Sequence, residues 1–99
     1  MEDLRMCSPA TEHDRVCVQD SIVNGIKVKK GVRIQMPITA AHYDPEFFPE
    51  PEKFKPERFL KENADNIIPY TWRPFGSGNR VCIGQRFAMM EMKIIIAKL

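Results

Sequence analysis

The residue whose type and position point most directly to chemistry is Cys82, which comes shortly before a segment with helical periodicity. A sulfur at the start of a helix lies near the free N–H groups of the first turn and the positive end of the helix dipole. Both favour the thiolate, which is the form of cysteine that binds a metal ion. Gly76, Gly78 and Gly84 let the surrounding backbone turn tightly and approach a flat partner closely.

Two neighbouring side chains extend this site toward haem. Arg80 carries a planar guanidinium that suits a carboxylate, and haem has two propionates. Phe75 can cover the sulfur and exclude water, which tunes the redox potential of a bound iron. A lone cysteine is more often a buried structural residue. The pattern Phe-x-x-Gly-x-Arg-x-Cys-x-Gly fixes five of ten positions, however, and it predicts that Cys82 is the axial ligand of a haem iron.

The other cysteines, Cys7 and Cys17, form no recognisable site with Cys82. The number of cysteines, 3, is odd, and no pair has the spacing Cys-x-x-Cys. A disulfide framework and a structural zinc site are therefore not expected, and the composition suits a reducing compartment. His13 and His42 have no metal-ligand spacing to another candidate, so we interpret them as strand and turn residues.

The elements that would position the cysteine loop follow from hydrophobic periodicity. Residues 1–6 favour a short helix, and Pro9 ends it. Residues 15–36 predict strands, and Asn24-Gly25 is a strong signal for a hairpin turn. Residues 37–74 contain four prolines between positions 45 and 56, which predicts a segment that is mostly irregular.

The segment after Gly84 predicts a long amphipathic helix. Its apolar residues recur at helical spacing, at Ile83, Phe87, Met90, Ile94 and Ala97. The expected fold is α+β, with a short N-terminal helix, a small antiparallel sheet with the hairpin, an irregular meander, the cysteine loop and a long C-terminal helix. We expect residues 1–99 to be the carboxy-terminal haem-binding part of a larger, mainly helical domain that is incomplete at both ends.

Composition and charge limit the class of protein. The 43% of hydrophobic and 28% of charged residues are typical of a globular protein. No apolar run reaches the length of a membrane span. Five basic side chains follow residue 69 against one acid, which favours an acidic partner or an anionic cofactor as much as a solvated helix face. No basic run is interleaved with aromatic residues, so nucleic acid is not an expected partner.

Four motifs occur in an order that resembles a known family. They are Glu2-Asp3-Leu4-Arg5, Pro56-Glu57-Arg58-Phe59, the loop from Pro74 to Gly84, and Ala88 with Glu91 in the following helix. Along essentially the whole chain, they resemble the cytochrome P450 family of haem-thiolate monooxygenases. Residues 49–54 and 74–78 are most similar to the microsomal branch, which includes vertebrate drug-metabolising and insect detoxification enzymes.

The resemblance implies roles for four further residues. Glu2, Arg5 and Arg58 would form a buried charge triad that locks the meander beneath the haem. Removing one partner of such a group strands a buried charge, at a cost of roughly 3–5 kcal/mol. Arg15 would offer a second basic contact to a haem propionate, unless it is a surface arginine of a strand.

The resemblance also implies the reaction and the partners of the whole protein. One oxygen atom from O2 would be inserted into a small lipophilic organic substrate, with haem b as the cofactor. Electrons would come from NADPH through a flavoprotein reductase, and NADPH would not bind this chain. The location would be the cytosolic face of the endoplasmic reticulum membrane, with a membrane anchor outside these residues. Thr11, Glu12 and His13 make the stretch that would pass the substrate pocket unusually polar.

Two other functions stay open at the level of sequence. The whole protein could be a haem-thiolate isomerase or dehydratase that rearranges peroxides without a reductase or O2. The chain could also be a non-enzymatic, inactive fragment. The family's oxygen-activating helix would lie upstream of residue 1, so Cys82 is the only residue here with an implied role in the reaction. We expect residues 1–99 in isolation to have no monooxygenase activity.

Overall fold

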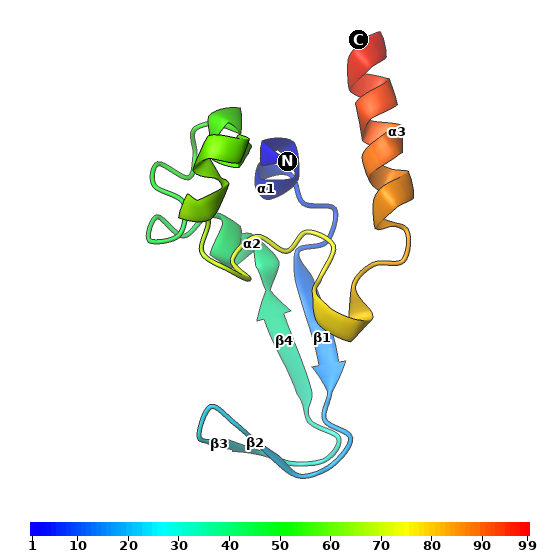
Figure 1. Ribbon diagram of the computed structural model, residues 1–99. Helices are drawn as coiled ribbons and strands as arrows, with labels where there is room; N and C mark the ends of the chain where they lie inside the picture. Colours follow the sequence, from blue (N-terminus) through cyan, green and yellow to red (C-terminus); the bar gives the residue numbers. More distant parts are fainter.

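A computed structural model describes residues 1–99 and shows three parts (Figure 1). A helix-and-sheet unit lies in the middle, a meander of short helices packs beside it, and the C-terminal helix stands apart on the other side. The cysteine loop connects the central unit to this last helix. None of the helices has both the length and the apolar character that a membrane crossing needs.

The central unit begins with α1 (Glu2–Met6) and a two-stranded antiparallel sheet. β1 (Glu12–Val16) pairs with β4 (Arg33–Pro37), so that His13 lies opposite Met36 and Arg15 opposite Ile34. The helix predicted over residues 1–6 is confirmed. The first strand, in contrast, begins at Glu12 and ends before Val18, so the predicted start at residue 15 was wrong.

β2 (Ser21–Val23) and β3 (Ile26–Val28) form the predicted hairpin. Asn24 and Gly25 have φ values of 47° and 80°, the two positive values that a two-residue type I′ turn requires. This hairpin is a second sheet and not a continuation of the first, which corrects the expectation of one sheet. The reason is local: the Asp20 carboxylate accepts the Lys30 N–H at 2.9 Å, and a side chain thus replaces a ladder partner.

The segment from 37 to 74 is more regular than the sequence suggested. It contains α2 (Ile38–His42) and the 3-10 helices η1 (Pro56–Phe59) and η2 (Lys61–Asn66), and a third, η3 (Gly78–Arg80), lies in the cysteine loop. Pro56 stands at the first position of η1, where its fixed φ favours a helix. α2 has only five residues, which is too short to show a helical period in the sequence.

The buried core is small and half polar. Its apolar side chains are Leu4, Ile38, Phe48 and Phe75, and they lie beside the buried side chains of Glu2, Arg5, His42 and Thr71. The radius of gyration is 15.8 Å, compared with about 13 Å for a compact domain of this length. Polar contacts therefore determine much of the arrangement in this chain.

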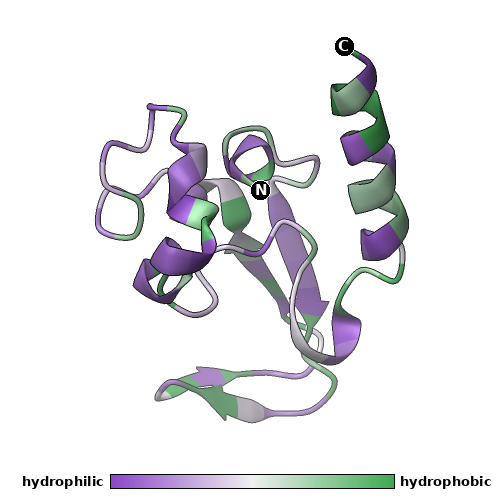
Figure 2. Ribbon diagram, turned by 45° about the horizontal axis from the view of Figure 1, so that its top comes forward, coloured by the Kyte–Doolittle hydropathy of each residue, from purple (hydrophilic) through white to green (hydrophobic).

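The long C-terminal helix, α3 (Gln85–Lys98), is confirmed, and none of its residues is buried. Figure 2 shows hydrophobic and hydrophilic residues alternating along the turns of this helix. The face predicted from the sequence is exposed, with Phe87 and Met90 more than half accessible, and the neighbouring Ile95 and Ile96 are exposed as well. A helix with apolar residues on more than one side is typical of a helix that other elements cover.

Candidate functional site

The cysteine loop, residues 74–84, is a tight turn that leads into α3. Gly76 and Gly78 have φ values of 75° and 68°, which glycine adopts without a steric cost. The Gly76 N–H donates to the Arg73 carbonyl at 3.0 Å, and the Cys82 N–H donates to the Phe75 carbonyl at 2.9 Å. The backbone on both sides of the turn is thus joined, and Cys82 lies next to Phe75.

The sulfur of Cys82 is accessible and forms no disulfide. Two residues separate Cys82 from the first residue of α3, and the Gln85 N–H donates to the Cys82 carbonyl at 3.3 Å. A Cβ on Gly84 would lie 3.8 Å from the sulfur, so the missing side chain at this position leaves one flank of Cys82 open. Cys82 therefore offers a sulfur ligand at the N-terminal end of a helix.

Two arginines face the same open pocket near this loop. Arg15 of β1 and Arg80 of η3 line it together with Asp14, Val16 and Val18. Both guanidiniums are exposed, and Arg15 donates to the Asp14 carbonyl at 2.7 Å while its other N–H groups stay free for a ligand. Two cations beside apolar valines suit a ligand with an apolar body and carboxylate groups.

The residues present fit a haem better than a bare metal ion. No group of three or more His, Cys, Asp or Glu side chains could hold an ion. Cys82 by itself supplies one ligand, so the other ligands of its metal would have to come from a cofactor such as a porphyrin. Phe75 is buried in the core, and its carbonyl accepts the hydrogen bond of the Cys82 amide. This fit does not require the Phe75 ring to cover the sulfur.

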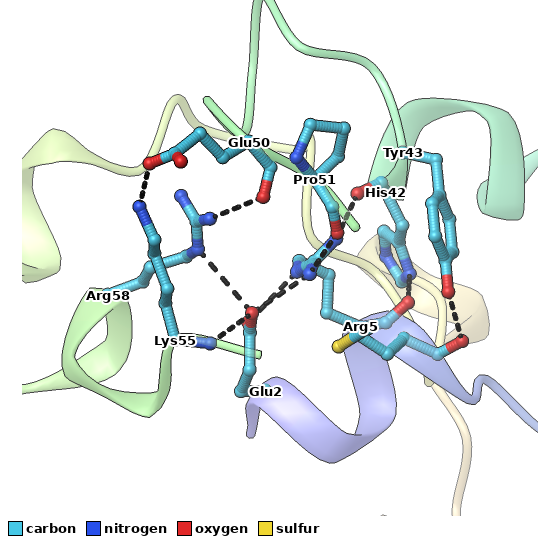
Figure 3. A network of polar contacts seen from close by, with 9 residues as sticks. Glu2, Arg5, His42, Tyr43, Glu50, Pro51, Lys55 and Arg58 are labelled. Carbon is cyan, nitrogen blue, oxygen red and sulfur yellow. Dashed lines mark hydrogen bonds and ion pairs between the residues drawn. The ribbon is translucent and has the colours of Figure 1, made fainter. Parts of the chain in front are cut away.

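Behind the loop lies a buried network around Glu2, which Figure 3 shows from close by. Arg5 binds both carboxylate oxygens of Glu2, at 2.9 Å each. Two further N–H groups donate to the carbonyls of His42 and Pro51, at 2.7 Å each. The Arg5 guanidinium also lies over the rings of Tyr43 and Phe48, at 5.5 and 5.4 Å from their centroids, which is within the range of a cation–π contact.

Arg58 completes the group from the other side. Its Nε lies 3.4 Å from Glu2 as an ion pair but makes no hydrogen bond, and its Nη2 donates to the Glu50 carbonyl at 3.0 Å. The Lys55 N–H donates to Glu2 at 3.2 Å. The three residues that the resemblance implied as a triad are thus in contact, with Arg5 bound far more closely than Arg58. We call Glu2, Arg5 and Arg58 the charge network, together with the backbone groups that bind them, which belong to His42, Glu50, Pro51 and Lys55.

The charge network controls the ionisation of Glu2. Burial by itself would raise the pKa of this carboxyl. The hydrogen bonds from Arg5 and the Lys55 amide, with the charges of Arg5 and Arg58, outweigh burial and lower the pKa below the usual 4.5. Glu50, at the exposed edge, accepts hydrogen bonds from the Lys53 and Lys55 ammonium groups, which lower its pKa to about 2.

His13 lies in a strand, as predicted, whereas His42 does not lie in a turn. His42 is the last residue of α2 and completely buried, and not a turn residue. His13 of β1 points toward the cysteine loop, with its Nε2 3.4 Å from the Arg73 carbonyl. Glu12 contacts the Gln35 amide at 3.2 Å. The polarity of this stretch therefore serves contacts within the chain, and it carries less information about a substrate than we expected.

Comparison with known proteins identifies the family. The model of the family described as Cytochrome P450 matches residues 1–99. The chain is 50% identical over 97 residues to cytochrome P450 3A31 of Mesocricetus auratus, and the match covers 98% of this chain and 19% of the relative. It is 48% identical to cytochrome P450 3A7 of Homo sapiens, with the same coverage. The chain belongs to the cytochrome P450 family.

A third relative, cytochrome P450 3A19 of Capra hircus aegagrus, is 44% identical over 99% of this chain and 45% of its own length. The chain thus spans about a fifth of the length of the first two relatives and less than half of the third. This cytochrome P450 chain carries the cysteine loop and the charge network together. Sequence reasoning missed His42, Pro51 and Lys55, since all three bind the charge network through backbone groups that no side-chain pattern marks.

Proposed function

We propose that Cys82 is the axial thiolate ligand of a haem b iron, and that the whole protein is a monooxygenase. The observation that carries the proposal is that the exposed, free Cys82 lies in the same loop as Arg80, which lines a pocket together with Arg15. Membership of the cytochrome P450 family supports the same cofactor and class of reaction.

Each part of the site has a distinct task in this proposal. Arg15 and Arg80 bind the haem propionates and fix the orientation of the ring. The cysteine loop holds Cys82 in a fixed position, because hydrogen bonds to the carbonyls of Arg73 and Phe75 close its backbone. The charge network anchors the meander behind the loop. When bound, haem supplies the oxygen chemistry, and its thiolate ligand donates electron density to the iron.

The partners follow from the same reaction. We propose that the substrate is a small lipophilic organic molecule and that a flavoprotein reductase delivers electrons from NADPH. The basic residues on and near α3, among them Arg86, Lys93 and Lys98, would attract an acidic reductase surface. The whole protein would work at the cytosolic face of the endoplasmic reticulum membrane, held by an anchor outside residues 1–99.

The ligation is tested in the full-length protein by the carbon monoxide difference spectrum after reduction. We expect the red-shifted Soret band of a thiolate-ligated haem, and we expect Cys82→Ala to abolish it. Cys7→Ala is the matched control, since Cys7 is also exposed and free, and it should leave the band unchanged. A thiolate band that survives in Cys82→Ala would refute the proposal. Product formation that requires O2 and reductase, and not a peroxide substrate alone, separates a monooxygenase from an isomerase.

A further inference from the structure

We propose that His42 is a positioning residue that joins the charge network to the cysteine loop through the backbone of Arg73. This inference rests on the proposed haem ligation by Cys82, and it assigns to a buried histidine a role in holding that ligand in place. His42 contacts both α1, through Arg5, and the segment that enters the loop, through Arg73.

The contacts of the His42 ring determine its state. Nδ1 lies 3.1 Å from the Arg5 carbonyl, and since a carbonyl only accepts, Nδ1 must carry the hydrogen. Nε2 accepts the Arg73 N–H at 3.2 Å, so Nε2 must be free of hydrogen. Both ring nitrogens are therefore used, and only the neutral imidazole with hydrogen on Nδ1 satisfies both neighbours.

From Arg73 the connection continues to the metal ligand. The Arg73 carbonyl accepts the Gly76 N–H at 3.0 Å, and two residues further the Phe75 carbonyl accepts the Cys82 N–H at 2.9 Å. On its other side, the Arg73 carbonyl lies 3.4 Å from the Nε2 of His13. The peptide groups of Arg73 are thus held by two histidines, one from α2 and one from β1. Because Arg73 directly precedes the loop, its position sets that of Cys82.

A proton on His42 would release this connection. It would place an N–H of His42 against the N–H of Arg73. The charged ring would also face the guanidinium of Arg5 and the nearby charge of Arg73, with Glu2 as the acidic group closest in the network. Burial, which the hydrogen bond to the Arg5 carbonyl only partly offsets, and the charges of Arg5 and Arg73 lower the pKa of His42 below 6.5. Acid should therefore loosen the loop.

Two variants of the haem-loaded, full-length protein separate positioning from packing. In His42→Gln, the amide oxygen can accept the Arg73 N–H from about the place of Nε2. In His42→Asn, the shorter amide can donate to the Arg5 carbonyl from about the place of Nδ1 but does not reach Arg73. Each variant loses one buried hydrogen bond, His42→Gln the one to Arg5 and His42→Asn the one to Arg73. We expect the thiolate band to decay about tenfold faster in His42→Asn than in the wild type, and less fast in His42→Gln, because only His42→Asn loses the bond that holds the entry to the loop.

The pH dependence is a second readout. In the wild type, the decay of the thiolate band should accelerate as the pH falls below about 6.5, the ordinary pKa of histidine. In His42→Gln, this part of the acceleration should disappear, since glutamine does not titrate. Equal decay in both variants, or an unchanged acid profile in His42→Gln, would overturn the inference and leave the haem ligation untouched.

Hydrogen exchange at the Arg73 amide tests the contact without haem. The amide should exchange about tenfold faster in His42→Asn than in the wild type, and at the wild-type rate in His42→Gln. Equal exchange in all three proteins would overturn the inference. If the wild type itself shows no thiolate band, the proposed ligation fails, and the exchange of Arg73 still decides whether His42 holds the loop.

Discussion

Replacing Arg5 by lysine in the full-length protein would test how the charge network is held together. Arg5 donates four hydrogen bonds from a completely buried guanidinium, two to Glu2 and one each to the carbonyls of His42 and Pro51. Lysine keeps the positive charge but has three donors on a single nitrogen. Arg5→Lys therefore leaves at least one buried acceptor unpaired and loses the two parallel bonds to the carboxylate.

The size of the effect follows from these contacts. An unpaired buried acceptor costs about 1–3 kcal/mol, and a buried ion pair that loses a partner costs roughly 3–5 kcal/mol. Because lysine retains the charge, we expect Arg5→Lys to destabilise the network by about 3 kcal/mol, the lower end of the range for a broken buried ion pair. Such a change corresponds to roughly a hundredfold in the equilibrium for local opening.

Hydrogen exchange at the Lys55 amide measures that opening, since this N–H donates to Glu2. Arg58→Lys is the matched control, because it makes the same change of side chain on the other arginine of the network. Arg58 is 13% exposed, its Nε makes no hydrogen bond, and it donates one bond to Glu50. Arg58→Lys should accelerate exchange by no more than about tenfold, the value of one hydrogen bond. An equal or larger effect of Arg58→Lys would refute the inference that Arg5 contributes more than Arg58 to the stability of the charge network.

Three further predictions concern the loop, the pocket and the acid stability. Gly76→Ala should accelerate the thermal decay of the thiolate band more than Gly78→Ala does. Both glycines have positive φ, but only at Gly76 would a Cβ meet another side chain, at 3.4 Å. Arg15→Gln and Arg80→Gln should each weaken haem retention, measured by transfer to apomyoglobin, and the double variant should lose more than either. Glu2 has a lowered pKa, so its contribution to stability is complete above pH 4.5 and is lost as the pH falls below that value; Glu2→Gln should remove this part of the acid dependence of unfolding.

The elements that the sequence predicted are those with a local physical cause. The hairpin follows from Asn24-Gly25, because these residues adopt positive φ easily. α3 follows from a period that extends over several turns. α2 was missed since a helix of five residues shows barely one repeat. The break between the two sheets was missed because it depends on the Asp20 carboxylate, which replaces a backbone partner.

Within the site, the sequence predicted the groups but not their geometry. Glu2 and Arg5 are three residues apart on one helix, so their contact is local. The position of Arg58 opposite Glu2 came from the family resemblance, because no periodicity joins residues so far apart. The role of His42 was out of reach, since it contacts a carbonyl 37 residues away and an amide 31 residues away. Backbone partners of this kind leave no mark on residue type.

The contrast between the charge network and the rest of the chain explains how a short segment can fix a metal ligand. Hydrophobic burial is non-directional, and here the core has four buried apolar residues. Hydrogen bonds are directional, and they connect Glu2, Arg5, His42 and Arg73 to the cysteine loop in an unbroken sequence. The apolar residues of α3 stay exposed within residues 1–99, so they contribute little to this arrangement. We therefore expect hydrogen bonds, rather than hydrophobic burial, to set the position of Cys82 within these residues.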